Sequence, residues 1–364
     1  MNEGIRHVLF FSMSKNNLNS VGKTVANLVK SLSARNKDIV SRRFGLKNGK
    51  KETLESIGKS YGITRERVRQ IEEFTLGQLS KSAQGSPEVE KYSALAKNIL
   101  NENGGVLKEK DLFKAFSGSD AESVPNSSLV FVLTLDKDLI RFNDNDNFHS
   151  FWAANANVLN NFKNMASLCA NVLSKSGKVS QESEFYNLAK KNNISGLGGE
   201  LNQKHLTTYL TISKSVGKNI FNEVGLVSWA EVRPKGVRDK AYLVLKKESK
   251  PKHFSEIAKL INVAGFNSKK ANVQTVHNEL IKDQRFVLVG RGMYALSEWG
   301  YKTGTVKDVL IDVLKNSSKP LAKTALLAKV MNSRMVKENT VLLNLQDSKT
   351  FVRNDDGTYE LKEA

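Results

Sequence analysis

The sequence predicts a mainly α protein with small β-hairpins, built from short modules in tandem. Trp152, Trp229 and Trp299 recur at similar intervals, and each closes a passage in which a helical stretch precedes two short apolar strands separated by turn residues. The same frame returns near the C-terminus, where the run from Tyr359 matches the run from Tyr294 without a tryptophan. The expected hairpins are LIRF-NDND-NFHSFW, IFNEV-GLVSW, RFVLV-GRG-MYALSEW and TFVRN-DDG-TYELK.

Helices followed by a hairpin, repeated along the chain, are typical of winged helices. Val237 and Val306 open segments with the same helical spacing of apolar residues, which supports the repeat. One mixed α/β domain with coincidental tryptophan spacing is the alternative. We therefore expect tandem helix-turn-helix and winged-helix modules at residues 1–85, 86–155, 156–232, 233–300 and 301–364.

The charge of the chain predicts a polyanionic partner. Its 56 basic residues against 37 acidic ones give a net charge of +19, and nucleic acid is the commonest partner of such a protein. Most of this charge lies in residues 1–85 and 233–300. Residues 86–155 are acidic, so we expect a spacer or a protein-binding surface there.

Several function classes are disfavoured. Cys169 is the sole cysteine, which excludes a disulfide or a cysteine-based zinc site within one chain, and we expect it to be a buried apolar residue. Val21-Gly-Lys-Thr resembles the end of a phosphate-binding loop. That loop needs a glycine five positions before Gly22, where this chain has Asn17. The five histidines lack metal-site spacing, and the longest apolar run near the N-terminus is too short for a signal peptide or a membrane span. We expect no catalytic residues, cofactor, metal, membrane contact or small-molecule substrate, and a cytoplasmic protein.

The stretch from Thr53 to Leu79 has the pattern of a helix-turn-helix. Thr53 can cap a first helix that Gly62 ends, and Thr64 can cap a second helix. On this second helix, apolar spacing places one set of side chains inward and another outward. The inward set is Val68, Ile71, Thr75 and Leu79, and the outward set is Arg65, Glu66, Arg69, Gln70 and Glu73.

The outward set carries the side chains that read base edges. Arginine bonds guanine and glutamine bonds adenine through two atoms each, while glutamate accepts from cytosine. A helix-turn-helix presents these residues to the major groove. The alternative is an exposed helix on which Glu66 and Gln70 only neutralise the arginines.

Three runs within about residues 36–80 carry a family resemblance: Arg42-Arg-Phe-Gly-Leu, Thr53-Leu-Glu-Ser-Ile-Gly and Ile63-Thr-Arg-Glu-Arg-Val-Arg-Gln-Ile-Glu. Together they resemble region four of housekeeping sigma factors. The resemblance implies that Arg65, Glu66, Arg69 and Gln70 read the upstream promoter element and that Thr64 and Arg67 lie nearer the backbone. It implies double-stranded DNA and bacterial RNA polymerase core as partners, and association with the nucleoid. No segment resembles the aromatic-rich regions that melt promoter DNA, so we do not expect a complete initiating sigma factor.

A second DNA-binding segment is expected within residues 237–301. Val273, Val276 and Leu280 should point inward on one helix, with Gln274, His277, Asn278 and Lys282 outward, and Gly290-Arg291-Gly292 should form a wing tip. This segment is similar to the HARE helix-turn-helix family, which includes a domain of the RNA polymerase delta subunit. The expected DNA contacts are Lys269, Lys270, Gln274 and Arg291, with the three basic residues on phosphates.

We predict a DNA-binding transcription regulator that recognises promoter-type duplex DNA and docks on RNA polymerase. An architectural or defence-associated DNA binder without promoter specificity is one alternative. A polymerase accessory subunit resembling delta, acting through protein contacts, is the other.

Overall fold

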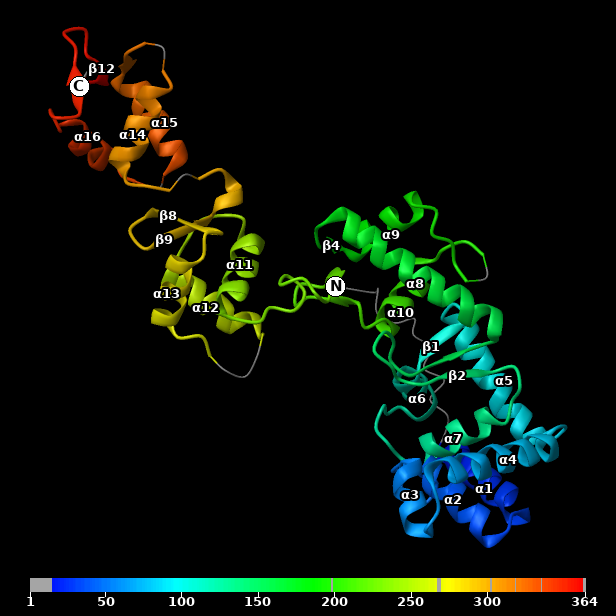
Figure 1. Ribbon diagram of the computed structural model, residues 1–364. Coiled ribbons are helices and arrows are strands. Elements are labelled where there is room, and N and C mark those ends of the chain that lie inside the picture. The colour runs from blue at the N-terminus through cyan, green and yellow to red at the C-terminus, as the bar shows by residue number, and fades with distance from the viewer. Residues whose placement is uncertain are drawn as a thin grey trace. The chain divides into compact units, whose positions relative to one another are not determined.

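The computed structural model describes residues 15–197, 199–266, 270–301, 303–317, 319–334 and 336–362. Its described residues are mainly helical and carry small three-stranded antiparallel sheets, which confirms the predicted fold class. The chain divides into two compact units, one of residues 1–218 with 222–227 and the other of residues 219–221 with 228–364 (Figure 1). No helix within the described ranges is long and apolar enough to cross a bilayer.

One order of elements occurs four times: helix, strand, helix, helix, strand, strand. In each sheet the third strand lies between the first and second. The first strand of each sheet was not predicted, because two or three residues are too few to show a period-two pattern. In the first unit the repeats are α5 (Pro87–Glu102), β1 (Val106–Lys108), α6 (Glu109–Ser117), α7 (Val124–Thr134), β2 (Ile140–Phe142), β3 (Phe151–Ala153), and α8 (Ala156–Ser176), β4 (Ser180–Gln181), α9 (Glu182–Lys191), α10 (Gln203–Ile212), β5 (Val216–Lys218), β6 (Glu223–Leu226). In the second unit they are α11 (Val237–Glu248), β7 (Lys252–His253), α12 (Phe254–Ala264), α13 (Val273–Lys282), β8 (Phe286–Gly290), β9 (Met293–Leu296), and α14 (Val306–Lys315), β10 (Leu321–Ala322), α15 (Lys323–Ser333), α16 (Glu338–Leu345), β11 (Phe351–Arg353), β12 (Thr358–Leu361).

The second and third predicted hairpins need correction. The prediction divided the second hairpin between Val224 and Gly225, but both residues lie inside β6. The turn precedes them, because the Asn219 side chain accepts from the Phe221 amide and Asn222 adopts a positive φ of 61°. Trp152 lies in β3 as expected, whereas Trp229 follows the end of β6 and Trp299 lies in the 3₁₀ turn η2 (Ser297–Trp299) after β9.

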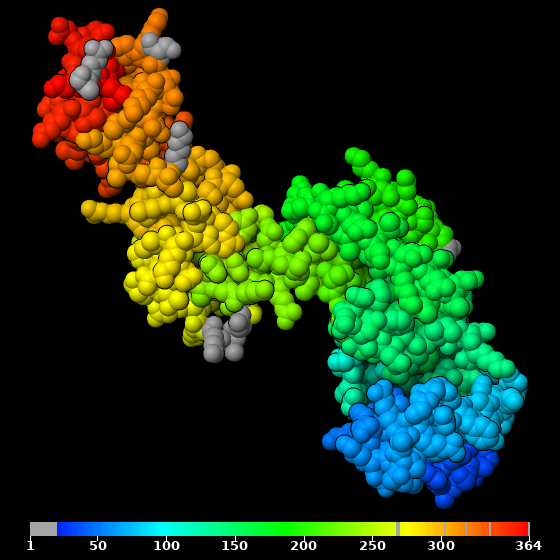
Figure 2. Space-filling model, viewed as in Figure 1, coloured from blue at the N-terminus to red at the C-terminus, as the bar shows by residue number. Residues whose placement is uncertain are grey.

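The N-terminal helices share a core with the repeat that follows them. The long helix α4 contributes Thr75 to the interior near its middle and Leu79 and Ala83 to the core that contains Trp152. The space-filling view shows the blue N-terminal helices and the cyan and green residues after them as one continuous surface (Figure 2). The helices of this region are α1 (Lys15–Leu28), η1 (Val29–Ser31), α2 (Ala34–Phe44), α3 (Leu54–Tyr61) and α4 (Arg65–Ala83).

Helix α7 joins these two parts. Residues 126–133 are buried without interruption, so this helix is buried on every side rather than along one stripe. It packs against α1, α2, α5 and α6, and Phe131 meets Phe44 of α2 edge to face with ring centroids 5.2 Å apart. Because α7 belongs to residues 86–155, its burial packs α1 and α2 against that acidic segment.

A buried carboxylate reinforces the junction. Glu109 accepts two hydrogen bonds from Arg141, at 2.5 and 2.9 Å, and one from Trp152 Nε1 at 3.2 Å. Lys51, from the loop before α3, donates to it at 3.2 Å. Burial alone would raise the pKa of Glu109, but the hydrogen bonds and charges of Arg141 and Lys51 outweigh it and hold this pKa below its ordinary value. The pKa of Lys51 is lowered by burial, with added repulsion from Arg141, so Arg141 is the principal partner of Glu109.

The next repeat is attached through α10. Tyr209 donates to the Gly104 carbonyl at 2.9 Å, and the His149 amide donates to the Ile212 carbonyl at 2.9 Å. Phe148 and Ser213 form an isolated antiparallel bridge. In its own repeat, α8 buries Cys169 as predicted, and this burial raises the pKa of the thiol to about 12.

In the second unit, each repeat has a core of its own. Residues between 241 and 296 supply one, centred on Leu245, Ile257 and Leu280. Residues between 309 and 351 supply the other, centred on Leu310, Leu326 and Val341.

Candidate nucleic-acid interface

The helix-turn-helix predicted around residues 53–79 is formed by α3 and α4. The Thr53 hydroxyl accepts from the Ser56 amide, and Gly62 ends α3 with a positive φ of 65°. The Thr64 hydroxyl accepts from the Arg67 amide at 3.2 Å and caps α4. Both predicted helices and their caps are therefore confirmed.

The turn between α3 and α4 depends on Gly58. A Cβ atom at this position would lie 2.7 Å from the Ile63 carbonyl oxygen, closer than real Cβ contacts allow. The absent side chain lets the two helices approach. A small core of Ile39, Ile57 and Val68 then joins them to α2.

Ion pairs from α2 fix the orientation of α3 and α4. Arg42 binds Glu52 through two nitrogens, at 3.0 and 2.7 Å, and Arg43 binds Glu72 of α4 at 3.2 Å. Tyr61 donates to Asp38 at 2.9 Å. Sequence reasoning missed these positioning contacts, because partners in different segments of the chain leave no periodic signal.

The outer face of α4 exposes every residue predicted to contact DNA in this segment. Thr64, Arg65, Glu66, Arg67, Arg69 and Gln70 are all exposed. The inward positions Val68, Thr75 and Leu79 are buried as expected, and Ile71 is half-buried. The face presents donors and acceptors of the kinds that read guanine, adenine and cytosine.

These side chains bond to one another in the protein without DNA. Arg69 binds Glu66, with 2.6 Å between Nη2 and Oε1, and also binds Glu73. The hydrogen bond and charge of Glu66 raise the pKa of Arg69, and the same hydrogen bond lowers the pKa of Glu66. Arg67 donates to Gln70 Oε1 at 3.1 Å, whereas Arg65 has no hydrogen bond or ion pair among the described residues. The arginines are thus partly neutralised within the helix.

This segment matches a known family. Residues 28–81 match the family model described as Sigma-70, region 4. The RNA polymerase sigma factor SigA of Microcystis aeruginosa is 42% identical over 61 residues, which are 17% of this chain and 15% of that protein. The RNA polymerase principal sigma factor HrdD of Streptomyces coelicolor is 43% identical over 56 residues, which are 15% of this chain and 17% of that protein. The similarity therefore spans a small part of both chains.

The third helices of the first three repeats differ in exposure. In winged helices the third helix is the one that enters the groove. Here α7 is buried, and α10 packs on β1 of the preceding repeat, so neither presents a full face to a ligand. Helix α13 exposes Gln274 and Asn278, and Lys270 just before it is also exposed.

Two of the predictions for residues 237–301 need correction. Val273 was expected to point inward but is 41% exposed, because the helix begins at this residue and only Val276 and Leu280 reach the core. His277 was expected to point outward but is half-buried and stacks on Phe254, with centroids 4.3 Å apart. Arg291 is exposed in the turn between β8 and β9, at the predicted wing tip. Lys269 lies outside the described residues.

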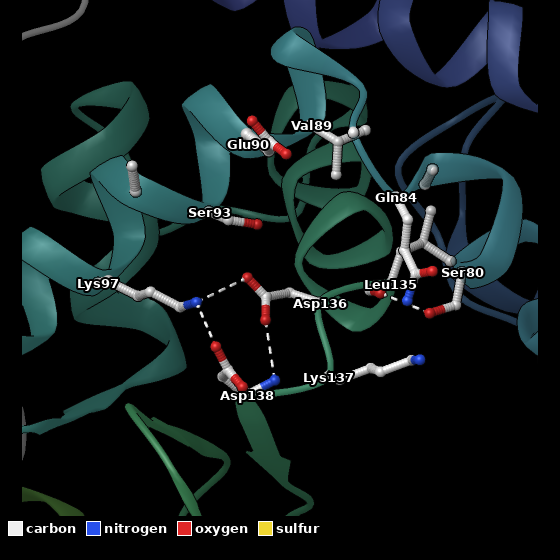
Figure 3. Close-up of a pocket in the computed structure, with 13 residues that line it drawn as sticks. Ser80, Gln84, Val89, Glu90, Ser93, Lys97, Leu135, Asp136, Lys137 and Asp138 are labelled. Atoms are coloured by element: carbon white, nitrogen blue, oxygen red, sulfur yellow. Dashed lines mark hydrogen bonds and ion pairs between the residues drawn. The ribbon is translucent and has the colours of Figure 1, made fainter.

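One groove of about 580 Å³ lies beside the C-terminal end of α4 (Figure 3). Lys97 reaches across it to Asp136 at 3.1 Å and Asp138 at 2.8 Å, and Ser80 donates to the Leu135 carbonyl at 2.8 Å. These contacts pair Lys97 with the two aspartates. Among the described residues, no group of three or more His, Cys, Asp or Glu side chains could hold a metal ion.

Proposed function

We propose that this protein is a sigma-like DNA-binding regulator whose α3–α4 helix-turn-helix reads the sequence of duplex DNA. The observation that carries the proposal is the exposed outer face of α4, with Arg65, Arg69 and Gln70 on a helix that lies within the region-4 match. The ion pairs of Arg42 and Arg43 support it, because base reading needs a helix held at a fixed angle.

Contacts to the phosphate backbone come from both basic segments in this proposal. Thr64 at the N-cap of α4 and Arg67 in its first turn are exposed. Lys270 is exposed before α13, and Arg291 is exposed in the turn between β8 and β9. Docking on RNA polymerase core is part of the proposal, since the matched relatives are named as polymerase sigma factors. Retention of polymerase by the tagged protein after nuclease treatment tests the docking, and absence of polymerase from such a preparation contradicts it.

An architectural DNA binder without sequence preference is the second candidate. The bonds of Arg69 to Glu66 and Glu73, and of Arg67 to Gln70, favour it because they occupy the groups that would read bases. In the first candidate DNA replaces these exposed pairs, which contribute little to stability.

Fluorescence anisotropy separates the two candidates. The full-length protein is titrated with a promoter-like duplex and with a scrambled duplex of equal length and composition, each over a range of salt concentrations. Sequence reading predicts a preference for the promoter-like duplex that persists as salt rises, because base contacts release few counterions. Equal affinities with the same salt dependence would support the architectural candidate instead.

A further inference from the structure

The exposed face of α13 combines amide and apolar side chains. Gln274, Asn278 and Ile281 lie at helical spacing along one stripe, and Val273 adjoins its first turn. Ile281 is 63% exposed and Val273 is 41% exposed, and Val263 of α12 and Leu288 of β8 are also exposed in this repeat. This face of α13 therefore offers both hydrogen-bonding and apolar side chains to a ligand.

The two amides are already bonded to each other. Gln274 Nε2 donates to Asn278 Oδ1 at 3.1 Å, one helical turn away. This bond leaves the Gln274 oxygen as an acceptor and the Asn278 nitrogen as a donor. Adenine presents the complementary pair in the major groove, a donor at N6 and an acceptor at N7.

We propose that α13 is a second sequence-reading helix and that it selects A·T base pairs. The amides of Gln274 and Asn278 bond adenine, and Val273 and Ile281 contact the methyl group of thymine, which is the apolar group of the major groove. This inference rests on the proposed function, since it requires that the chain bind duplex DNA.

The charges around the face favour DNA over a protein partner. Lys270 is exposed three residues before the helix, Lys282 is exposed at its last position, and Arg291 is exposed in the turn between β8 and β9. Cations around a polar and apolar strip suit a helix in a groove with phosphates on both sides.

Selection from a random pool of duplexes tests the proposal without knowledge of the target. Four full-length proteins are compared: the wild type, Gln274→Ala/Asn278→Ala, Arg65→Ala/Arg69→Ala, and the control Asn160→Ala/Asn161→Ala, which removes two exposed amides from α8. The wild type and the control should enrich two sequence blocks, one of them rich in A·T. The α13 variant should lose only the A·T block, and the α4 variant only the other block.

The chemistry is then tested on the selected duplex. Replacing adenine by 7-deazaadenine in the A·T block removes N7, and replacing thymine by uracil removes the methyl group. Each change should weaken wild-type binding by about tenfold. The α13 variant should be nearly unaffected by 7-deazaadenine, because it lacks the two amides, but should still respond to uracil, because it keeps Val273 and Ile281. Circular dichroism confirms that each variant is folded.

The outcomes separate the two proposals. If α4-dependent enrichment persists but the α13 variant enriches the same sequences as the wild type, the α13 inference is wrong and the proposed function stands. If the wild type enriches no sequence, both are overturned. Loss of the A·T block in the α8 control would also overturn the inference, because the effect would not be specific to α13.

Discussion

Arg69 has different partners in the protein without DNA and in the proposed complex. Its guanidinium binds Glu66 and Glu73 on the exposed face of α4, so a guanine must compete with two carboxylates. Such exposed pairs contribute little to stability, whereas one bidentate contact to guanine is worth about 1–3 kcal/mol. The exchange therefore favours the correct base and gives little advantage to others.

We expect Arg69→Ala to weaken binding to the preferred duplex by about 1–3 kcal/mol and binding to random duplex far less. Glu73→Gln should strengthen binding to duplex DNA at low salt, because it removes a negative charge and frees Arg69 from one of its two carboxylate partners. Competition titrations with both duplexes measure the two effects. Equal losses on both duplexes for Arg69→Ala would contradict base reading by this residue.

Glu109 gives a prediction about pH. Its pKa is lowered in the folded protein, so its contribution to stability is present above the unfolded value of about 4.3 and is lost as pH falls through the folded pKa. Glu109→Gln should destabilise the protein by about 3 kcal/mol at neutral pH, because Arg141 and Lys51 lose their anion. Urea midpoints of wild type and variant should begin to converge as the pH falls below about 4.3 and should meet below the folded pKa of Glu109.

The matched control is Glu55→Gln, whose carboxylate is exposed and pairs with Lys59 at 3.7 Å. Its urea midpoint should stay close to that of the wild type at every pH. A Glu109 variant that is as stable as this control at pH 7 would contradict the role assigned to the buried carboxylate.

At the scale of elements, two glycines of the helix-turn-helix predict opposite effects. Gly58→Ala should destabilise α3 and α4 by about 1–3 kcal/mol, because the added Cβ meets the Ile63 carbonyl. Gly77→Ala should stabilise α4 by about 1 kcal/mol, since no described atom lies within 4 Å of its added Cβ. Hydrogen exchange of the α3 and α4 amides measures both, and a shift of the same sign in the two variants would contradict the packing described.

Much of this element could be predicted from sequence because its signals are local. Thr53, Gly62 and Thr64 mark the helix ends through bonds to residues a few positions away. The contacts of Arg43 with Glu72 and of Lys51 with Glu109 join distant positions, and no periodic pattern reports them. The apolar residues 129–133 of α7 indicate from the sequence that this helix is buried. The sequence does not indicate that α1 and α2 are the helices that pack on it.

At the scale of the whole molecule, the repeats have separate tasks. The first repeat uses α7 to hold α1 and α2, the second uses α10 to pack on β1, and the third exposes α13. The acidic residues 86–155 suit support of the helix-turn-helix rather than contact with phosphates. Repetition of one topology therefore does not imply repetition of one function.

Salt dependence tests how the net charge is used. Lys270→Ala/Arg291→Ala should reduce the slope of log K against log salt by about two units, because two phosphate contacts are lost. The control Lys114→Ala/Lys137→Ala removes two exposed lysines from the acidic repeat and should leave the slope unchanged. An equal reduction in both variants would indicate a general effect of charge and contradict the placement of Lys270 and Arg291 on phosphates.

The central claim is that α4 lies in a groove at a defined DNA sequence, and tethered cleavage tests it most directly. Cys169 is buried with a pKa raised to about 12, so a cysteine introduced by Glu73→Cys is the reactive thiol for an iron chelate. On the promoter-like duplex we predict cleavage confined to a few adjacent nucleotides, with no such cleavage from Asn161→Cys on α8. Uniform cleavage along the duplex from the Glu73→Cys protein would contradict the claim.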